Sequence, residues 1–282
     1  MGGLARRVGY VKALGKLVDN QVPVLQLDAG HMLTDELNAM GIMDDPRVKN
    51  EWMLRAYWEQ DLAAANVSPR DVPYLSELMT TKDHAANAKK FPLLDRFVSA
   101  NVLPAGPGHV AFKPYLIREV RGGRVGAAPI RVGVLGVSEI PRRPMAAGAA
   151  YTISDPVEAA RKYLPELRAK ADVVVVLAYT DRETARRIGV EAPGIDMILT
   201  ARQYPVYNQV DEAGDAVVAF VANETRYLGE IRLYRKDGAK AGPIERYAHR
   251  NVPLDDVVPD DPAARDAVVA AKKAFTRTPT PK

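Results

Sequence analysis

The sequence contains no cysteine in 282 residues. Disulfide bonds, thiol nucleophiles and cysteine-ligated metal sites are therefore excluded. Long apolar runs are also missing: the longest, residues 173–178, is far shorter than the roughly 20 residues that a membrane-spanning helix needs. The first twelve residues contain no apolar core of the kind found in a signal peptide. We therefore expect no membrane span and no signal peptide in this chain.

A strong excess of one charge is missing as well. The chain has 39 basic and 35 acidic residues, and the basic ones are scattered along the sequence. A nucleic-acid-binding surface would need basic residues gathered on one face, so we expect no nucleic-acid partner. Hydrophobic residues make up 47% of the chain and charged residues 26%, as is typical of globular proteins. Such a chain can bury the core of one large α/β domain or of two small ones.

Helical and strand-like hydrophobic patterns follow one another along the chain. Apolar residues at helical spacing predict helices over residues 4–17, 50–65, 156–170 and 182–190. Short apolar runs predict strands over residues 22–27, 97–102, 115–120, 131–137, 172–177, 195–199, 217–222 and 230–234. The last two are expected to be antiparallel. Asp155 should cap the helix in which Pro156 takes the first position. This order predicts an α/β sandwich with helices outside and strands inside.

The C-terminal part of the chain has a different composition. Residues 255–261 are acidic and interrupted by proline, and a helix is predicted from Asp261-Pro262 to about residue 275. The segment TRTPTPK at residues 276–282 resembles a linker. We therefore divide the chain into a domain over residues 1–250 and a linker helix with its tail over residues 251–282.

Eight short segments, all in the same order, resemble the 5′-nucleotidase branch of the calcineurin-like metallophosphoesterases. Each is a weak signal alone, but together they span residues 2 to about 233 and are specific. The segments are GGLAR at residues 2–6, LDAG at 27–30, FPLL at 91–94 with SANV at 99–102, GVLGV at 133–137, DPVEAA at 155–160, ADVVVVL at 171–177, PGIDMI at 193–198 and YLGEI at 227–231.

The resemblance implies a four-layer α/β/β/α sandwich of the metallophosphoesterase type. In active members two divalent cations hydrolyse phosphate esters. Mn²⁺, Mg²⁺ or Zn²⁺ would be held there by carboxylates, imidazoles and an amide carbonyl. The family's first strand carries an Asp-x-His pair and lies upstream of the GG segment, where this chain starts. Truncation and true loss both explain this difference, and true loss would leave an unpaired edge in the sheet.

The resemblance also indicates which positions match the family's metal ligands. His31 stands where the family has the aspartate that bridges the two metals, and Asn66 matches the ligand asparagine. Tyr179 replaces a ligand histidine, while Arg202 and Tyr204 replace a histidine pair. Arginine and neutral tyrosine are poor ligands for these cations. His31 and Asn66 are therefore the candidate metal ligands that remain, and we expect no cofactor unless the protein is active.

These residues also have plain structural interpretations. His31 could simply end a strand, Asn66 could be the C-terminal residue of a helix, and Arg202 could fill space with its head in solvent. Arg202 could also hold a phosphate directly, because a guanidinium matches phosphate geometry. Val67 stands where the family has its catalytic histidine, so no catalytic residue is assigned.

We therefore expect a 5′-nucleotidase-like domain that has lost dinuclear metal catalysis and serves as a scaffold or interaction module. One alternative is an active metal-dependent phosphoesterase that hydrolyses nucleotides through a rearranged site. Another is a metal-free module that binds phosphate or a nucleotide. The family's C-terminal nucleoside-binding domain is not found before Lys282, so we expect a protein partner or further domains beyond it. The resemblance implies a periplasmic or otherwise exported protein, with the cytoplasm as the alternative location.

Overall fold

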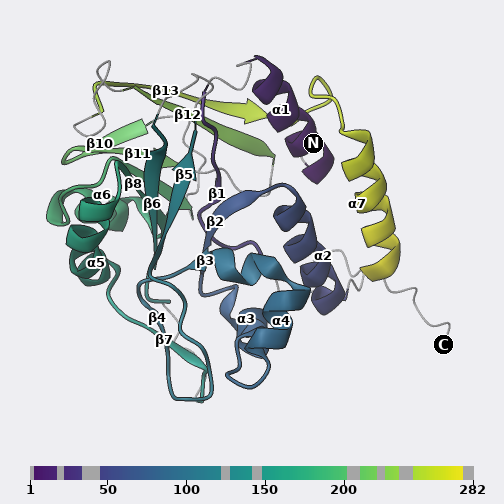
Figure 1. Cartoon of the computed structure of the whole chain (residues 1–282), viewed down its shortest axis with the longest axis horizontal. Helices are drawn as coiled ribbons and strands as arrows, with labels where there is room; N and C mark the ends of the chain where they lie inside the picture. The colour runs from purple at the N-terminus through teal and green to yellow at the C-terminus, as the bar shows by residue number, and fades with distance from the viewer. Residues whose placement is uncertain are drawn as a thin grey trace.

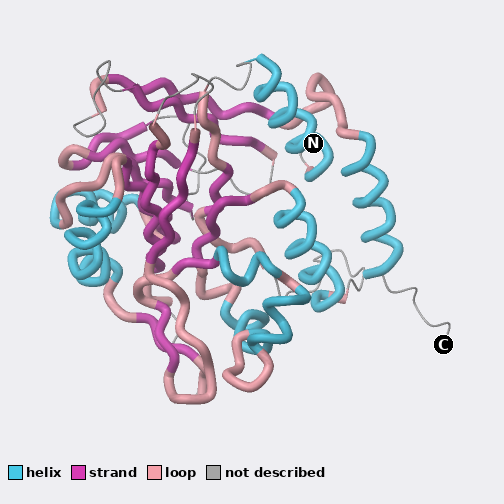
Figure 2. The backbone as a smooth tube through the Cα atoms, in the orientation of Figure 1, coloured by secondary structure: helices cyan, strands magenta, loops and turns pink. Residues whose placement is uncertain are grey.

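The computed structural model describes residues 3–17, 22–33, 45–121, 128–141, 148–201, 210–220, 226–234 and 244–275. Two groups of strands face each other in the middle of the molecule, and helices cover both outer sides (Figure 1). The predicted α/β/β/α layering is confirmed. Figure 2 shows the same arrangement, with the strands enclosed between two helical layers.

The larger sheet has six strands in the order β10-β11-β9-β8-β6-β5. Its inner strands are parallel to one another, and an antiparallel strand lies at each edge. The inner strands are almost continuously apolar, as expected where both faces of a sheet are covered. The strands are β5 (Tyr115–Val120), β6 (Ile130–Ser138), β8 (Val173–Tyr179), β9 (Met197–Ala201), β10 (Val210–Ala213) and β11 (Ala216–Phe220).

Two helices, α5 (Pro156–Lys170) and α6 (Arg182–Glu191), cover the outer face of this sheet (Figure 1). The predicted start of α5 is confirmed, because a carboxylate oxygen of Asp155 accepts hydrogen bonds from the backbone N–H groups of Val157 and Glu158 at 2.8 and 3.0 Å. These bonds satisfy donors that have no partner within the helix.

The second group of strands consists of a parallel sheet in the order β1-β2-β3 and a separate antiparallel hairpin, β12–β13. Leu27 of β1 and Ile231 of β12 belong to one hydrophobic cluster, which also fills the space under the six-stranded sheet. No ladder joins β1 to β12 among the described strands, so β1 is an edge strand there. The strands are β1 (Gln26–Asp28), β2 (Leu62–Asn66), β3 (Phe97–Val98), β12 (Tyr227–Tyr234) and β13 (Arg246–Pro253).

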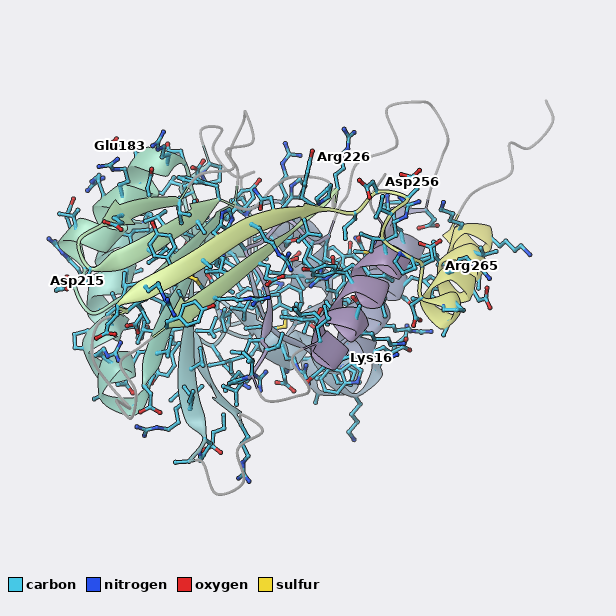
Figure 3. The ribbon with its side chains drawn as sticks, turned by 90° about the horizontal axis from the view of Figure 1, so that it is seen from above. Lys16, Glu183, Asp215, Arg226, Asp256 and Arg265 are labelled. Atoms are coloured by element: carbon cyan, nitrogen blue, oxygen red, sulfur yellow. The ribbon has the colours of Figure 1, made fainter. Side chains whose placement is uncertain are left out.

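Seen from above, the hairpin runs from the side of Asp215 toward the helices that carry Lys16 and Arg265 (Figure 3). A further pair of short antiparallel strands, β4 (Val102–Pro104) and β7 (Tyr151–Ile153), extends from the end of the molecule opposite to it (Figure 1).

The other helical layer is formed by the N-terminal part of the chain and by its last helix. α7 packs against α1 and α2, and the backbone N–H of Asp261 donates to the carbonyl of Ala5 at 3.0 Å. The helix predicted from Asp261-Pro262 is confirmed, and it is docked on the domain. The helices of this layer are α1 (Leu4–Leu17), α2 (Pro46–Glu59), α3 (Val72–Leu78), α4 (His84–Lys90), the 3₁₀ helix η1 (Pro92–Arg96) and α7 (Pro262–Phe275).

Three predicted elements differ in the structure. The strand predicted over residues 97–102 is two short strands of different sheets, β3 (Phe97–Val98) and β4 (Val102–Pro104). The helix predicted over residues 50–65 ends at Glu59, and the last part of that range is the buried strand β2. Asp61 separates the two with a positive φ of 54°, which a helix cannot continue through. The strands predicted over residues 217–222 and 230–234 exist but belong to different sheets, because β11 pairs with β10 and β9 while β12 pairs with β13.

The two sheets are in close contact at Gly136 of β6. A Cβ atom at this position would lie 2.6 Å from the Oδ1 atom of Asn66 and closer still to the carbonyl oxygen of Val98. Only glycine fits such a contact between backbones. The ends of β2, β3 and β6 are therefore packed directly on one another.

Candidate functional site

The carboxyl ends of five strands from both sheets meet at one place. β1 leads into the turn at Gly30, β2 ends at Asn66, and β6 ends at Ser138. β8 and β9 end at Tyr179 and Ala201, which contact each other and the turn after β1. α/β proteins place their functional groups at such strand ends. This convergence defines the candidate site.

The structure brings together three of the five predicted site residues. His31, Asn66 and Tyr179 all lie at these strand ends. Arg202 and Tyr204 lie outside the described residues. The interpretation of Asn66 as the last residue of a helix was wrong, because Asn66 ends a buried strand.

His31 follows β1 in a left-handed backbone conformation, with a φ of 67° that is uncommon for a residue other than glycine. Its side chain is exposed, and its ring lies edge-on to the ring of Tyr179 with 6.1 Å between the centroids. The backbone N–H of His31 donates to the Oδ2 atom of Asp71 at 2.9 Å. The imidazole is thus carried by a turn whose backbone is held in place by the carboxylate of Asp71.

Asp71 was not predicted from the sequence, yet it organises this turn. Its fully buried carboxylate accepts four hydrogen bonds, from the backbone N–H groups of His31, Leu33 and Ser68 and from the Ser68 hydroxyl. Burial raises the pKa of Asp71, and the donors of Ser68, Leu33 and His31 oppose that shift. The carboxylate therefore joins the turn after β1 to the loop after β2.

Asn66 is completely buried and makes its contacts through its amide nitrogen. Nδ2 donates to the carbonyl oxygens of Ala29 and Val137 at 3.2 and 2.8 Å, and lies 3.3 Å from the Ser138 hydroxyl. Oδ1 faces Gly136 and has no hydrogen-bond partner among the described residues. Since a carbonyl oxygen can only accept, these neighbours decide which end of the carboxamide is which.

A second carboxylate, that of the half-buried Asp28, lies at the end of the strand that leads into the site. Burial raises the pKa of Asp28, while the N–H of Gly30 and the nearby guanidinium of Arg7 oppose the shift. Arg7 of α1 is 7% exposed, and its guanidinium carbon lies 4.7 Å from the centre of the Tyr57 ring. This contact packs α1 against α2.

The described residues at these strand ends offer few ligands for a pair of divalent metal ions. Such cations need several oxygen or nitrogen ligands, most of them negatively charged. The amide oxygen of Asn66 faces Gly136, and Tyr179 is packed with Ala29 and Ala201 in a small apolar cluster. In the part of the chain that the structure describes, no three His, Asp or Glu side chains are grouped so that they could hold a metal.

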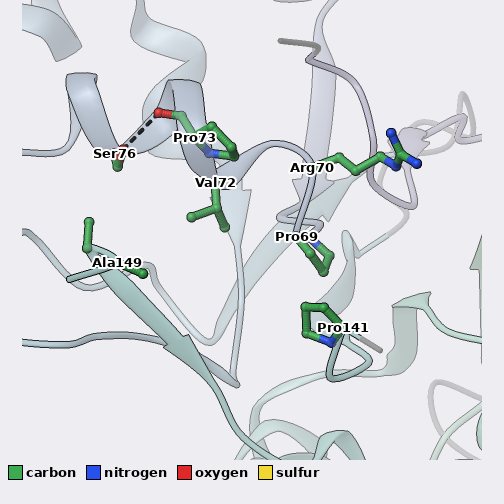
Figure 4. Close-up of a pocket in the computed structure, with 8 residues that line it drawn as sticks. Pro69, Arg70, Val72, Pro73, Ser76, Pro141 and Ala149 are labelled. Carbon is green, nitrogen blue, oxygen red and sulfur yellow. Dashed lines mark hydrogen bonds between the residues drawn. The ribbon is translucent and has the colours of Figure 1, made fainter. Parts of the chain in front are cut away.

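A cavity of about 330 Å³ lies beside the loop that follows β2 (Figure 4). Its walls are mostly proline rings and small aliphatic side chains, among them Pro69, Pro73 and Pro141. Figure 4 shows the Arg70 side chain pointing away from these rings, while the Ser76 hydroxyl donates to the carbonyl of Pro73 at 2.8 Å. The described wall therefore offers an apolar surface next to the strand ends.

A comparison with models of known protein families finds no match for this chain. Similar curated proteins include two described as 2′,3′-cyclic-nucleotide 2′-phosphodiesterase/3′-nucleotidase. The protein of Salmonella typhimurium is 28% identical over 230 residues, and that of Yersinia enterocolitica is 26% identical over 235 residues. Each alignment covers 75% of this chain but only 34% and 33% of the relatives. The chain thus spans about a third of the length of these relatives.

Solved structures with a similar fold cover nearly the whole chain. A sulfate thiohydrolase of Thermus thermophilus matches with a TM-score of 0.73 and 15% identity, over 97% of this chain and 47% of that one. A calcineurin-like phosphoesterase of Bacillus subtilis gives 0.71 and 17%, over 97% and 89%. A 5′-nucleotidase precursor of Thermus thermophilus gives 0.68 and 18%, over 97% and 53%. At these identities the likeness establishes the fold.

No helix in the described ranges is long and apolar enough to cross a membrane.

Proposed function

We propose that this chain, a metallophosphoesterase-type domain of the kind found at the N-terminus of 5′-nucleotidases, has lost two-metal catalysis and serves as a scaffold or interaction module. The observation that carries the proposal is the apolar packing of Tyr179 against Ala29 and Ala201 at the converging strand ends. Tyr179 places an aromatic ring where the family has a ligand histidine. His31 is therefore the one imidazole that the described residues contribute there.

The charge balance at the strand ends supports the same conclusion. Two divalent cations bring four positive charges, which a dinuclear site offsets with carboxylates and hydrogen-bonded imidazoles. The carboxylate of Asp71 is fully buried and is already used by four donors of the protein itself. His31, as a neutral imidazole, adds no negative charge.

The role as a scaffold or interaction module rests on the fold and on its relatives. The fold matches that of the solved neighbours over 97% of the chain, whereas the positions matched to the family's ligands, Asn66 excepted, hold other residue types. The curated relatives are about three times as long as the region they share with this chain. We propose that the domain acts together with further domains or a protein partner, and in an exported compartment as the resemblance implies.

Metal content and phosphoesterase activity test the proposal together. The purified protein is dialysed against excess Mn²⁺ and Zn²⁺ and then against buffer, and its metal content is measured by elemental analysis. We expect far less than one metal ion per chain, and no hydrolysis of 2′,3′-cyclic nucleotides or 3′-nucleotides above the uncatalysed rate. The Salmonella relative, treated in the same way, serves as the positive control. One or two bound metal ions with chelator-sensitive turnover would refute the proposal.

An active metal-dependent phosphoric ester hydrolase with a rearranged site is the second candidate. It is favoured by the His31 ring, which is exposed at the strand ends. The turn that carries this ring is bonded to Asp71. In this case a metal ion would bind to His31 and Asn66, with an upstream Asp-x-His pair completing its ligands, and His31→Ala would abolish both metal binding and turnover. The same substitution would change neither quantity in a non-catalytic domain.

A metal-free module that binds phosphate or a nucleotide through Arg202 is the third candidate. It predicts binding of inorganic phosphate or a nucleotide, measured by calorimetry, that is insensitive to EDTA and is lost in Arg202→Met.

A further inference from the structure

The carboxamide of Asn66 turns its nitrogen, which cannot ligate a cation, toward the turn after β1 and its oxygen toward Gly136 of the other sheet. We infer that Asn66 and Asp71 form a strand-end latch, which holds the turn after β1 in place without any bound cation. The inference rests on the proposed loss of metal catalysis. It adds that protein hydrogen bonds, and not metal ions, hold the strand ends in place.

The orientation of Asn66 follows from its neighbours. Both carbonyl oxygens near Nδ2, those of Ala29 and Val137, can only accept a hydrogen bond. The third neighbour, the Ser138 hydroxyl, gives its hydrogen to the carbonyl of Val67 at 2.6 Å, so its lone pairs face Asn66. A carboxamide turned by 180° would put its oxygen against three acceptors. Asn66 therefore cannot present its oxygen to a ligand without losing these contacts.

Asn66 connects three separate parts of the fold. It lies at the end of β2, and its amide reaches Ala29 after β1 and Val137 at the end of β6 in the other sheet. The residues it joins are 37 and 71 positions away in the sequence. Because these bonds are buried, water cannot easily replace one that is lost.

Asp71 holds the same turn from its other end. Its carboxylate accepts from the N–H groups of His31 and Leu33, which follow Ala29 in the chain. Asn66 and Asp71 thus fix the first and last parts of one short segment. Gly30, between them, is packed so that a Cβ would lie 3.2 Å from Ser68 and 3.4 Å from Tyr179. The latch leaves this turn little freedom to rearrange around a cation.

Thermal unfolding of Asn66 variants tests the latch. Asn66→Ala removes two buried hydrogen bonds and leaves a cavity at the contact between the sheets, so we expect Tm to fall by about 6–12 °C. Asn66→Asp keeps the shape but turns an anion toward the two carbonyl oxygens, so Tm should fall at least as far. Neither loss should be recovered with Mn²⁺ or Zn²⁺, nor increased with EDTA. The control is Asn87→Ala, a partly buried asparagine of α4 that donates only to the carbonyl of Leu78; its Tm should fall by less than about half as much.

The latch is refuted if Asn66→Ala lowers Tm no more than Asn87→Ala, or if Asn66→Asp gains stability from Mn²⁺ or Zn²⁺. Should the Asn66 variants not fold, hydrogen exchange of the wild-type protein decides the question. The N–H groups of His31 and Leu33 should be equally protected in EDTA and in Mn²⁺, and protection that rises with the metal would overturn the inference. These results are distinct from the proposed function, which the metal content and turnover of the wild-type protein decide.

Discussion

The backbone N–H of His31 donates a 2.9 Å hydrogen bond to the buried carboxylate of Asp71, 40 residues further along the chain. The same carboxylate accepts hydrogen bonds from the backbone N–H of Leu33 at 2.7 Å and from the hydroxyl of Ser68 at 2.6 Å. One side chain therefore sets the geometry of the turn that carries the exposed imidazole. The conformation of this turn is as firmly fixed as that of a strand, because buried hydrogen bonds to a charged group are costly to break.

Asp71→Asn should destabilise the protein by about 3–5 kcal/mol. The amide has one oxygen in place of two, and its NH₂ group would face backbone N–H groups that also donate. Urea unfolding followed by circular dichroism gives the free energy of unfolding. The matched control is Asp95→Asn, because Asp95 is exposed and its ion pair with Lys113 spans 3.4 Å. A similar loss for both variants would contradict the assignment of Asp71 as the organiser of the turn.

Gly136→Ala should cost about 3 kcal/mol or more, because the added methyl group would press on Asn66 and on the carbonyl of Val98. The neighbours are backbone and a fixed carboxamide, so the sheets would have to move apart. Gly106→Ala is the control, since a Cβ at Gly106 meets no atom within 4 Å. Equal unfolding midpoints in urea for the two variants would show that the contact at β6 has room to relax.

Glu230 should stabilise the protein at neutral pH and lose that effect in acid. Burial raises its pKa, but the hydrogen bonds from Tyr10, Arg250 and Arg232 outweigh burial and leave the pKa below its usual value of 4.5. A carboxyl group with a lowered folded-state pKa stabilises the fold above its unfolded pKa, and the effect disappears as the pH falls through the folded pKa. The contribution is therefore complete above 4.5 and is lost below it.

Glu230→Gln tests this pH dependence. Its free energy of unfolding should be lower than that of the wild type at neutral pH, and the difference should shrink as the pH is lowered to about 3. Glu77→Gln, which removes an exposed ion pair with Arg47, should change the pH profile much less. A difference between wild type and Glu230→Gln that is constant with pH would mean that Glu230 acts through packing and not through its charge.

The layered fold could be predicted from the sequence because its signals are local and repeated. The Asp155-Pro156 start of α5 and the apolar run of β8 each identify one element, and the eight family segments place these elements in order. The end of α2 was misplaced for a physical reason. Leu62 to Asn66 reads LAAAN, and alanine favours helices in isolation, but burial against Phe97 and Val98 turns this run into a strand.

The candidate site could be predicted only in part. The resemblance located His31, Asn66 and Tyr179 at one end of the sheets, because the order of the strands determines which strand ends meet. It could not give the orientation of the Asn66 carboxamide, which depends on Val137, 71 residues away. The spacing from Ser68 to Asp71 matches a helix-capping pattern and could have drawn attention to Asp71. Its bonds to the turn after β1 have no local signal.

Tyr179→His should not restore stoichiometric metal binding. The substitution returns an imidazole to a position next to His31, whose ring lies 6.1 Å from that of Tyr179. Two neutral imidazoles supply half of the ligands that a four-coordinate cation needs and none of the negative charge. The amide oxygen of Asn66 stays turned toward Gly136, because the carbonyls of Ala29 and Val137 keep the amide nitrogen between them.

Elemental analysis of Tyr179→His after dialysis with Mn²⁺, and separately with Zn²⁺, checks this prediction. Tyr179→Phe is the control, since it keeps the ring packed against Ala29 and Ala201 without the hydroxyl. Both variants should contain equally little metal after dialysis against buffer. One equivalent of metal in Tyr179→His alone would mean that a single side chain separates this domain from a metal site. In that case ligands from outside the described residues would have to complete the coordination, because the described strand ends offer too few.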